Sequence, residues 1–245
     1  MSAEAAHRRL RELCERHALS SEQGDALWRL LELVERDQHA PTAVRTRQRA
    51  VDVHVADSLA GLELEEVRAA GSIADVGSGA GFPGLVLAIA RCDSEVSLIE
   101  SQTRRCMFLE RAVAETGIAN AAVVCTRAEA WEQGSRRHDL VVARALAPMP
   151  VVLEYASPLL AVGGWLVDWR GARALAQERE AAVAASELGL QPMRVTPVEP
   201  FSGVRHRNLH LYLKVGPTPA RYPRRPGTAL RRPLGRPHNA QAERD

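Results

Sequence analysis

A glycine-rich stretch, IADVGSGAGFPG at residues 73–84, constrains the fold of this chain more than any other feature. Its second half, GAGFPG, matches the G-x-G-x-x-G pattern of dinucleotide-binding proteins. A glycine-rich turn between a first strand and a helix lets a ligand approach the backbone, because no side chains intervene. In a doubly wound sheet this turn lies at the carboxyl ends of the strands, where such ligands bind. The stretch therefore predicts a site for a nucleoside cofactor.

Short apolar segments alternate with helical segments from residue 72 onward. The segments SIADV, SEVSLIE, AAVVC, LVVA and GGWLVDW have the character of strands, and helical patterns lie between most of them. Strands that alternate with helices predict a parallel sheet covered on both faces. MRVTPV and NLHLYLKV come last with only a loop between them, which predicts an antiparallel pair at the sheet edge.

Two segments flank this α/β region, which is expected to occupy residues 71–215. Residues 1–70 predict a helical extension, with two amphipathic helices over 3–36 and a third helix over roughly 49–69. Residues 216–245 are rich in proline and arginine and almost without apolar side chains, so they predict a disordered basic tail. Such a tail is either a passive solvated segment or an electrostatic arm for RNA phosphate.

Composition and charge narrow the class of protein. Hydrophobic residues make up 46% and charged residues 25%, which is ordinary for a soluble globular protein, and a net charge of +2 does not by itself indicate a nucleic-acid binder. No apolar run is long enough for a membrane span, and the N-terminus lacks the apolar region of a secretory signal. We therefore expect a cytoplasmic monomer. The four cysteines are scattered along the chain and form no C-x-x-C pair; they are Cys14, Cys92, Cys106 and Cys125. We therefore expect reduced thiols rather than a disulfide or a metal site.

Charge separates two candidate cofactors. A dinucleotide loop that begins at Gly79 would put a carboxylate and a glycine into the buried strand before it, where both are unfavourable. A loop that begins at Gly77 leaves SIADV as a strand with Asp75 at its mouth, where a carboxylate attracts an ammonium group and repels a diphosphate. Glu100 ends the next strand nineteen residues after Gly81, close to the spacing of a ribose-binding carboxylate. S-adenosylmethionine, with its ammonium and sulfonium, is therefore favoured over NAD.

These motifs are joined by others along the chain. They are HVADS from His54, the loop DVGSGAGFPG, LIESQTRRCMFLERA, the Arg127-Ala128-Glu129 step, Val142-Ala143-Arg144-Ala145 and Trp169-Arg170-Gly171. In this combination the sequence resembles the bacterial glucose-inhibited division protein B family, methyltransferases that modify guanine N7 in small-subunit ribosomal RNA. The resemblance runs from about His54 to Lys214. It implies a class I S-adenosylmethionine-dependent methyltransferase fold, Rossmann-like with a seven-stranded sheet, behind an N-terminal helical extension.

The resemblance also implies where the site residues lie. The glycine loop would line the methionine and adenosine pocket, Glu100 would face the ribose, and Arg144 would act as the catalytic residue at the active-site mouth. With Asp75 included, the expected cofactor-binding set is Asp75, Gly77, Gly79, Gly81, Phe82, Glu100, Ser101, Gln102, Ala128, Glu129 and Arg144. The residues expected to contact RNA are Arg45, His54, Arg127 and Arg170, with surface ion pairs or a His54–Asp57 packing pair as the alternatives.

Two stretches depart from the family pattern. The family's W-N-x-x-x-N-L-T segment before the third helix is ERDQHAPTAVR here, and the lysine before the glycine of the fifth strand is Arg170. Both places are expected to face RNA. The expected partner is small-subunit ribosomal RNA or the assembled 30S particle. The alternatives are a paralogue that acts on another RNA or a small molecule, a nicotinamide-dependent oxidoreductase, and a non-catalytic RNA-binding module.

Overall fold

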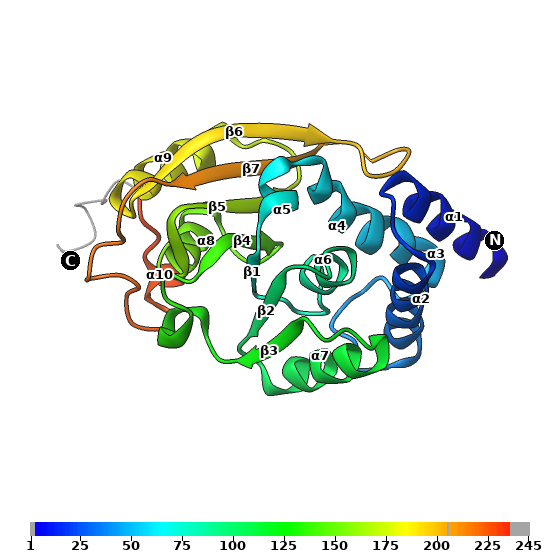
Figure 1. Ribbon diagram of the computed structural model, residues 1–245. Coiled ribbons are helices and arrows are strands. Elements are labelled where there is room, and N and C mark those ends of the chain that lie inside the picture. Colours follow the sequence, from blue (N-terminus) through cyan, green and yellow to red (C-terminus); the bar gives the residue numbers. More distant parts are fainter. Residues whose placement is uncertain (1–2, 205, 236–245) are drawn as a thin grey trace, which may run out of the picture.

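Seven strands form one sheet: β1 (Ser72–Val76), β2 (Glu95–Glu100), β3 (Ala121–Cys125), β4 (His138–Arg144), β5 (Leu160–Arg170), β6 (Leu190–Val198) and β7 (Arg207–Lys214). In the computed structural model, which describes residues 3–204 and 206–235, their order is β3-β2-β1-β4-β5-β7-β6 (Figure 1). The first five strands are parallel, and β7 runs antiparallel to both β5 and β6. The expected α/β fold and its antiparallel edge pair are confirmed.

The central parallel strands end together at one edge of the sheet. Val76 of β1 is in register with Ile99 of β2, and Asp75 with Val142 of β4. The chain leaves β1 for β2 on one side, whereas β4 lies on the other side of β1, so the strand order reverses here. Open α/β sheets bind their ligands at such switch points. The glycine loop, residues 77–83, follows β1 at this edge.

Helices cover both faces of the sheet and divide the core in two. The helices that follow the strands are α6 (Gly84–Ala90), α7 (Thr103–Thr116), α8 (Met149–Ala156) and α9 (Leu175–Glu187). Figure 1 shows α6 and α7 on one face and α8 and α9 on the other. Successive side chains of β1 alternate between these cores: Ile73 packs under α6, and Ala74 packs under α8. Within the described residues, no helix has the length and hydrophobicity needed to cross a membrane.

The N-terminal helices lie on the α6–α7 side. They are α1 (Ala3–Arg16), α2 (Ser21–Arg36), α3 (Arg47–Ala50), α4 (Asp57–Leu59) and α5 (Glu65–Ala69). The Ser20 side chain accepts from the Gln23 amide while the Gln23 side chain accepts from the Ser20 amide, a capping box that fixes the start of α2. Leu27 and Leu30 of α2 are fully buried, as their helical spacing predicts.

The expected third helix over residues 49–69 is broken in the structure. A π-helical turn, η1 (Val51–Ala56), separates α3 from α4, and a 3-10 turn, η2 (Ala60–Glu63), precedes α5. Leu64 has an extended backbone between η2 and α5. The apolar spacing predicted helix correctly, but it does not report where the hydrogen-bonding pattern changes. Single π turns are frequent at functional sites, and η1 contacts the candidate site described below.

The C-terminal segment departs from the expected disordered tail. Residues 216–235 pack against the α/β domain and include α10 (Thr228–Arg231), whereas 236–245 lie outside the described residues. Ala229 and Tyr222 are 2% and 9% exposed and join the core that α8 and α9 cover. Low apolar content predicted disorder. A few buried anchors hold the segment instead, and composition alone does not reveal them.

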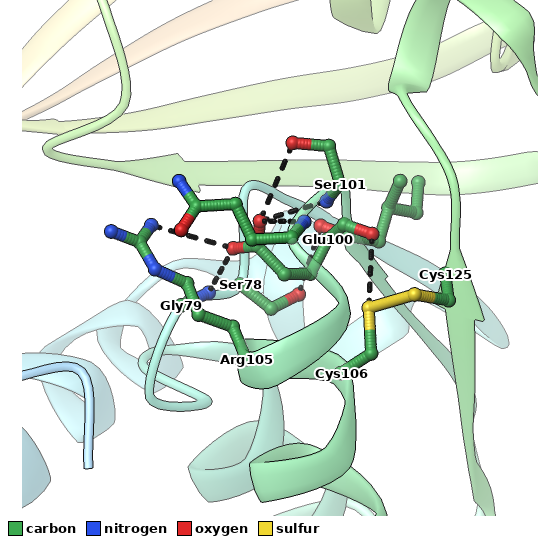
Figure 2. Close-up of a disulfide and its surroundings, with 9 residues drawn as sticks. Ser78, Gly79, Glu100, Ser101, Arg105, Cys106 and Cys125 are labelled. Carbon is green, nitrogen blue, oxygen red and sulfur yellow. Dashed lines mark hydrogen bonds and ion pairs between the residues drawn. A yellow bond between two sulfur atoms is a disulfide. The ribbon is translucent and has the colours of Figure 1, made fainter. Parts of the chain in front are cut away.

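Two cysteines form a disulfide, contrary to the expectation of four unpaired thiols. Cys106 of α7 and Cys125 at the end of β3 are bonded, with their Cα atoms 5.7 Å apart (Figure 2), while Cys14 and Cys92 are free. They are separated by 19 residues in sequence. The turn from α7 into β3 brings them together, and a search for C-x-x-C spacing cannot detect such a tertiary pair.

Replacing Cys125 by serine tests the disulfide. A cross-link that closes a loop of this length contributes about 3 kcal/mol by restricting the unfolded chain. Without reductant, we expect Cys125→Ser to lower the free energy of unfolding by about this amount, measured by urea denaturation. With reductant, the variant and the parent protein should unfold alike. Cys92→Ser is the control, because Cys92 is a free and exposed thiol. If Cys125→Ser and the parent protein are equally stable both with and without reductant, Cys106 and Cys125 do not pair in solution.

Candidate active site

A cavity of about 270 Å³ opens where β1, β2 and β3 end. This volume is near the lower end of the roughly 300–1,000 Å³ typical of small-molecule sites. The expected cofactor residues that line it share a position at the carboxyl ends of strands; they are Gly77, Glu100, Ser101, Gln102, Ala128 and Glu129. The other members of the expected set are not in this lining: Asp75, Gly79, Gly81, Phe82 and Arg144.

The Glu100 carboxylate lies at the rim of the cavity and is held by three backbone amides (Figure 2). Its Oε1 accepts from Ser101 and Gln102 at 2.7 and 2.9 Å, and its Oε2 accepts from Gly79 at 3.2 Å. Nη1 of Arg105 lies 3.7 Å from Oε2. Two carboxylate oxygens offer about four lone-pair sites. Glu100 therefore ties the glycine loop to β2 and retains capacity to accept from ribose hydroxyls.

The backbone conformation and the packing of the loop require glycine at two positions, Gly77 and Gly81. Gly77 has φ +74° and Gly81 has φ +88°, in the left-handed region that side chains other than glycine rarely adopt. A Cβ on Gly77 would lie 2.5 Å from Cδ1 of Leu146, and one on Gly81 would lie 2.2 Å from Cδ1 of Leu85. The loop is therefore pressed against its neighbours, and its first residue, Gly77, lines the cavity.

Asp75 lies behind the loop rather than at the mouth of the cavity. Its Oδ2 accepts from the amide of Gly84, the first residue of α6, at 3.0 Å, and the residue is 1% exposed. A Cβ on Gly84 would lie 2.5 Å from that oxygen. The structure thus turns the carboxylate toward the start of α6, where it fixes the end of the glycine loop. The expectation that Asp75 meets an ammonium group assumed that the end of β1 is open to the ligand. In the structure the carboxylate is buried there and accepts from the Gly84 amide.

Burial makes Asp75 a titrating group. Loss of water raises the pKa of its carboxyl from an ordinary value of 3.8 to about 7, against the hydrogen bonds from Gly84 and Ser78. Because the folded pKa is raised, the folded state holds its proton more tightly. The contribution of Asp75 to the free energy of unfolding is then complete below about pH 4 and declines as the pH rises to about 7. The isosteric variant Asp75→Asn cannot titrate.

We expect the free energy of unfolding of the parent protein, minus that of Asp75→Asn, to fall between about pH 4 and 7 and to level off above. Urea denaturation across this range measures the difference. A constant difference would mean that Asp75 keeps one charge state throughout.

Glu129 and Tyr155 form the far end of the cavity, beyond Ala128. Burial, followed by the charge of Glu129, raises the pKa of the Tyr155 phenol to about 12, so it is neutral at physiological pH. Arg127, expected to contact RNA, also lines the cavity. This end combines a carboxylate acceptor with apolar surface, which suits a flat heterocycle that carries an amino donor.

Arg144 joins the end of β4 to the N-terminal helices. Its Nη1 donates to the Val53 carbonyl at 3.0 Å and to Oδ2 of Asp57 at 2.7 Å. Nε of Arg207 lies 2.6 Å from the other oxygen of Asp57, which is 1% exposed. Two guanidinium groups therefore share one buried carboxylate. The arrangement fixes the π-helical turn η1 against the sheet, beside the glycine loop.

A chain of hydrogen bonds continues from Arg144 through His54. Nη2 of Arg144 lies 3.3 Å from Nδ1 of His54, and Nε2 of His54 lies 2.9 Å from Oγ1 of Thr42. A guanidinium only donates, so Nδ1 accepts and Nε2 carries the proton. Burial, with the Arg144 charge, lowers the pKa of His54 to about 4, which keeps the ring neutral. The ring stacks on Phe82 at 4.3 Å, so His54 connects the glycine loop to the connector before α3.

The remaining RNA candidates are engaged within the fold. Arg45 donates to backbone carbonyls of residues 37–40 and closes the connector between α2 and α3. Arg170 pairs with the buried Asp168, its Nε 2.6 Å from Oδ2. Both arginines stay partly exposed, whereas Arg127 faces the cavity. Arg45 and Arg170 therefore have partners within the fold, and Arg127 has a place in the cavity lining.

Eight lining residues were not among the expected site residues: Val76, Ile99, Arg105, Thr126, Ala145, Leu146, Tyr155 and Leu230. Arg105 lies within the LIESQTRRCMFLERA motif and Thr126 directly follows β3, so both are close in sequence to expected site residues. Leu146 follows Arg144 in the same way. No sequence signal marked Tyr155 or Leu230, because each reaches the cavity from a separate helix.

The strand order, the reversed β7 and a cavity at the ends of β1 and β2 define a class I methyltransferase fold. Solved structures share it at low sequence identity. An S-adenosylmethionine-dependent methyltransferase from Aquifex aeolicus aligns with a TM-score of 0.53 and 16% identity, covering 68% of this chain and 96% of that one. The fibrillarin pre-rRNA processing protein of Methanococcus jannaschii aligns with a TM-score of 0.52 and 18% identity, covering 66% and 74%.

Sequence relatives define the family within this class. The family described as rRNA small subunit methyltransferase G matches residues 26–207. Proteins named ribosomal RNA small subunit methyltransferase G are 38% identical in Moorella thermoacetica, over 79% of this chain and 82% of that one, and 40% identical in Rubrobacter xylanophilus, over 74% and 72%. The chain belongs to this family, which confirms the resemblance drawn from the motifs.

Proposed function

We propose that this protein transfers the methyl group of S-adenosylmethionine to N7 of a guanine in small-subunit ribosomal RNA. One structural observation supports the assignment of the cofactor. The Glu100 carboxylate lines the cavity and is held by the Gly79, Ser101 and Gln102 amides. Membership of the rRNA small subunit methyltransferase G family supports the RNA substrate. The motif resemblance supports N7 as the target atom. We also propose that the protein is a monomer and that it is located in the cytoplasm.

The cavity residues suit S-adenosylmethionine by their chemistry. A ribose presents two hydroxyl donors, and Glu100 offers carboxylate acceptors at the rim. Adenine presents an amino donor on a flat apolar ring, and Glu129 lies beside Ala128 at the far end. Gly77 and Leu146 lie against each other in the cavity lining, and a methionine chain would pass along them. In this assignment Asp75 acts through Gly84, by holding the loop in place.

Catalysis of this reaction depends on positioning the base relative to the methyl group more than on proton transfer. When bound, S-adenosylmethionine supplies a methyl group already made electrophilic by its sulfonium. Guanine N7 has a free lone pair, so no base must remove a proton from it. The task of the protein is then to hold the base in line with the methyl group and to exclude water. No Ser-His-Asp arrangement is required for this chemistry.

Arg144 is proposed to hold the target base. Its Nη1 is committed to Val53 and Asp57, whereas Nη2 makes only the long contact to His54 among the residues that the structure describes. An Nη2 donor is suited to guanine O6, and one hydrogen bond there leaves N7 free to attack. Asp57, which Arg144 shares with Arg207, offsets part of the guanidinium charge and so reduces its repulsion of the positive charge that develops on the base.

The experiment uses purified protein, tritiated S-adenosylmethionine and small ribosomal subunits from cells that lack this gene. We expect label in the RNA of these subunits and none in large-subunit RNA. Deproteinised small-subunit RNA, assayed in parallel, distinguishes free RNA from the assembled particle as substrate. Cofactor binding without label in either form would contradict ribosomal RNA as the substrate.

A further inference from the structure

The C-terminal segment over residues 216–235, which we name the strap, lies outside the family match at 26–207 but reaches the cofactor cavity. Figure 1 shows it, coloured orange to red, running from the end of β7 to α10 beside α8. One strap residue, Leu230 of α10, lines the cavity together with Glu129 and Tyr155. The described chain therefore completes this cavity with a segment that the family match does not include.

Buried polar contacts fix the strap to the domain. At its start, Nζ of the buried Lys214 lies 2.6 Å from Oγ1 of Thr218. At its middle, Nε of Arg224 contacts both carboxylate oxygens of Glu154, at 2.9 and 3.1 Å, and the Arg224 amide donates to the same group. Glu154 is 1% exposed. A buried carboxylate without its arginine is strongly unfavourable, so this pair favours the docked position of the strap.

The last contact connects the strap to the cofactor cavity. The Gly227 amide donates to Oε1 of Glu129 at 3.1 Å, and the Tyr155 phenol also hydrogen-bonds this carboxylate. Two carboxylate oxygens offer about four lone-pair sites, so acceptor capacity remains for a ligand. Leu230 follows one helical turn later and is 52% exposed, unlike Ala229 beside it, which is 2% exposed. An exposed leucine in the wall of a cavity is apolar surface that a bound ligand can cover.

We propose that the strap forms the adenine-side wall of the cofactor site, with Leu230 packing on the adenine ring and Gly227 orienting Glu129 toward the adenine amino group. The inference rests on the proposed function, because it takes the occupant of the cavity to be S-adenosylmethionine. It adds a segment outside the family match to the binding site, and it gives this basic C-terminal region a role in cofactor affinity rather than in RNA binding.

Calorimetric titration with S-adenosylhomocysteine in the absence of RNA tests this directly. Covering part of a leucine side chain is worth about 1 kcal/mol, so Leu230→Ala is expected to weaken binding about fivefold. Leu175→Ala is the matched control, because Leu175 is 63% exposed on α9 and does not line the cavity. It should bind as the parent does. Unchanged binding by Leu230→Ala, or equal weakening by both variants, would overturn the proposal.

A second ligand tests which end of the cofactor meets the strap. Methylthioadenosine carries the adenosine but lacks the amino-acid portion, so Leu230→Ala should weaken its binding by the same factor. A loss confined to S-adenosylhomocysteine would place Leu230 at the methionine end and contradict the assignment. Failure of the parent protein to bind either ligand would instead contradict the proposed function. Thermal melting of Leu230→Ala should match the parent, since the side chain is half exposed.

Discussion

Replacement of Glu100 by alanine is expected to weaken the binding of S-adenosylhomocysteine by about 100-fold, measured by calorimetry. The change removes the proposed ribose acceptor and leaves the amides of Gly79, Ser101 and Gln102 without their partner. Hydrogen bonds to a charged group contribute about 1.5–3 kcal/mol each. The loss of one such bond to ribose accounts for an effect of this size.

The control for this change lies on the same strand. Glu95 begins β2, is exposed, and is far along the strand from the cavity, so Glu95→Ala should bind the ligand normally. Glu100→Gln keeps the size of the side chain and one acceptor oxygen, and we expect an intermediate loss. Normal binding by Glu100→Ala would mean that the ligand lies elsewhere.

Replacement of Arg144 by alanine is expected to lower the rate of methyl transfer by about 100-fold or more. A small misplacement of a reacting group can alone reduce a rate by about 100-fold, and Arg144→Ala removes both the proposed contact to the base and the anchor of η1. Stability should also fall, because Asp57 is buried and loses one of its two cations. Single-turnover rates and urea denaturation of the same preparation separate the two effects.

Arg207→Ala is the matched control for Arg144→Ala. Arg207 pairs with the same carboxylate of Asp57, but it reaches that carboxylate from β7 and is not among the residues beside the glycine loop. We expect a comparable loss of stability and a much smaller loss of rate. If the rates of both variants fall in proportion to their stability, Arg144 supports the fold and does not hold the base.

The sequence was sufficient to predict the sheet and several of the residues that line the cavity. Short apolar runs are local properties of a sequence, so SIADV and SEVSLIE indicate β1 and β2 without knowledge of their neighbours in the fold. The glycine loop and Glu100 follow directly from those strand ends. Parallel strands bring their carboxyl ends to one edge, and this rule placed residues from β1, β2 and β3 together.

The contacts that depend on distant segments were not predictable in this way. Cys106 and Cys125 pair because α7 turns back into β3, and the strap packs because a few anchors outweigh its polar composition. The direction of a side chain behind a strand end is equally non-local. Asp75 faces the Gly84 amide because the glycine loop folds over it, a contact visible only once the loop is in place.

The identity of the methylated atom tests the central claim most directly. Small subunits from cells that lack this gene would be methylated with the purified protein, and the RNA then reduced and treated with aniline, which cleaves the chain at N7-methylguanine. The account predicts cleavage at one guanine of small-subunit ribosomal RNA, dependent on S-adenosylmethionine and absent with Glu100→Ala. Methyl transfer without this cleavage, or cleavage only in another RNA, would contradict it.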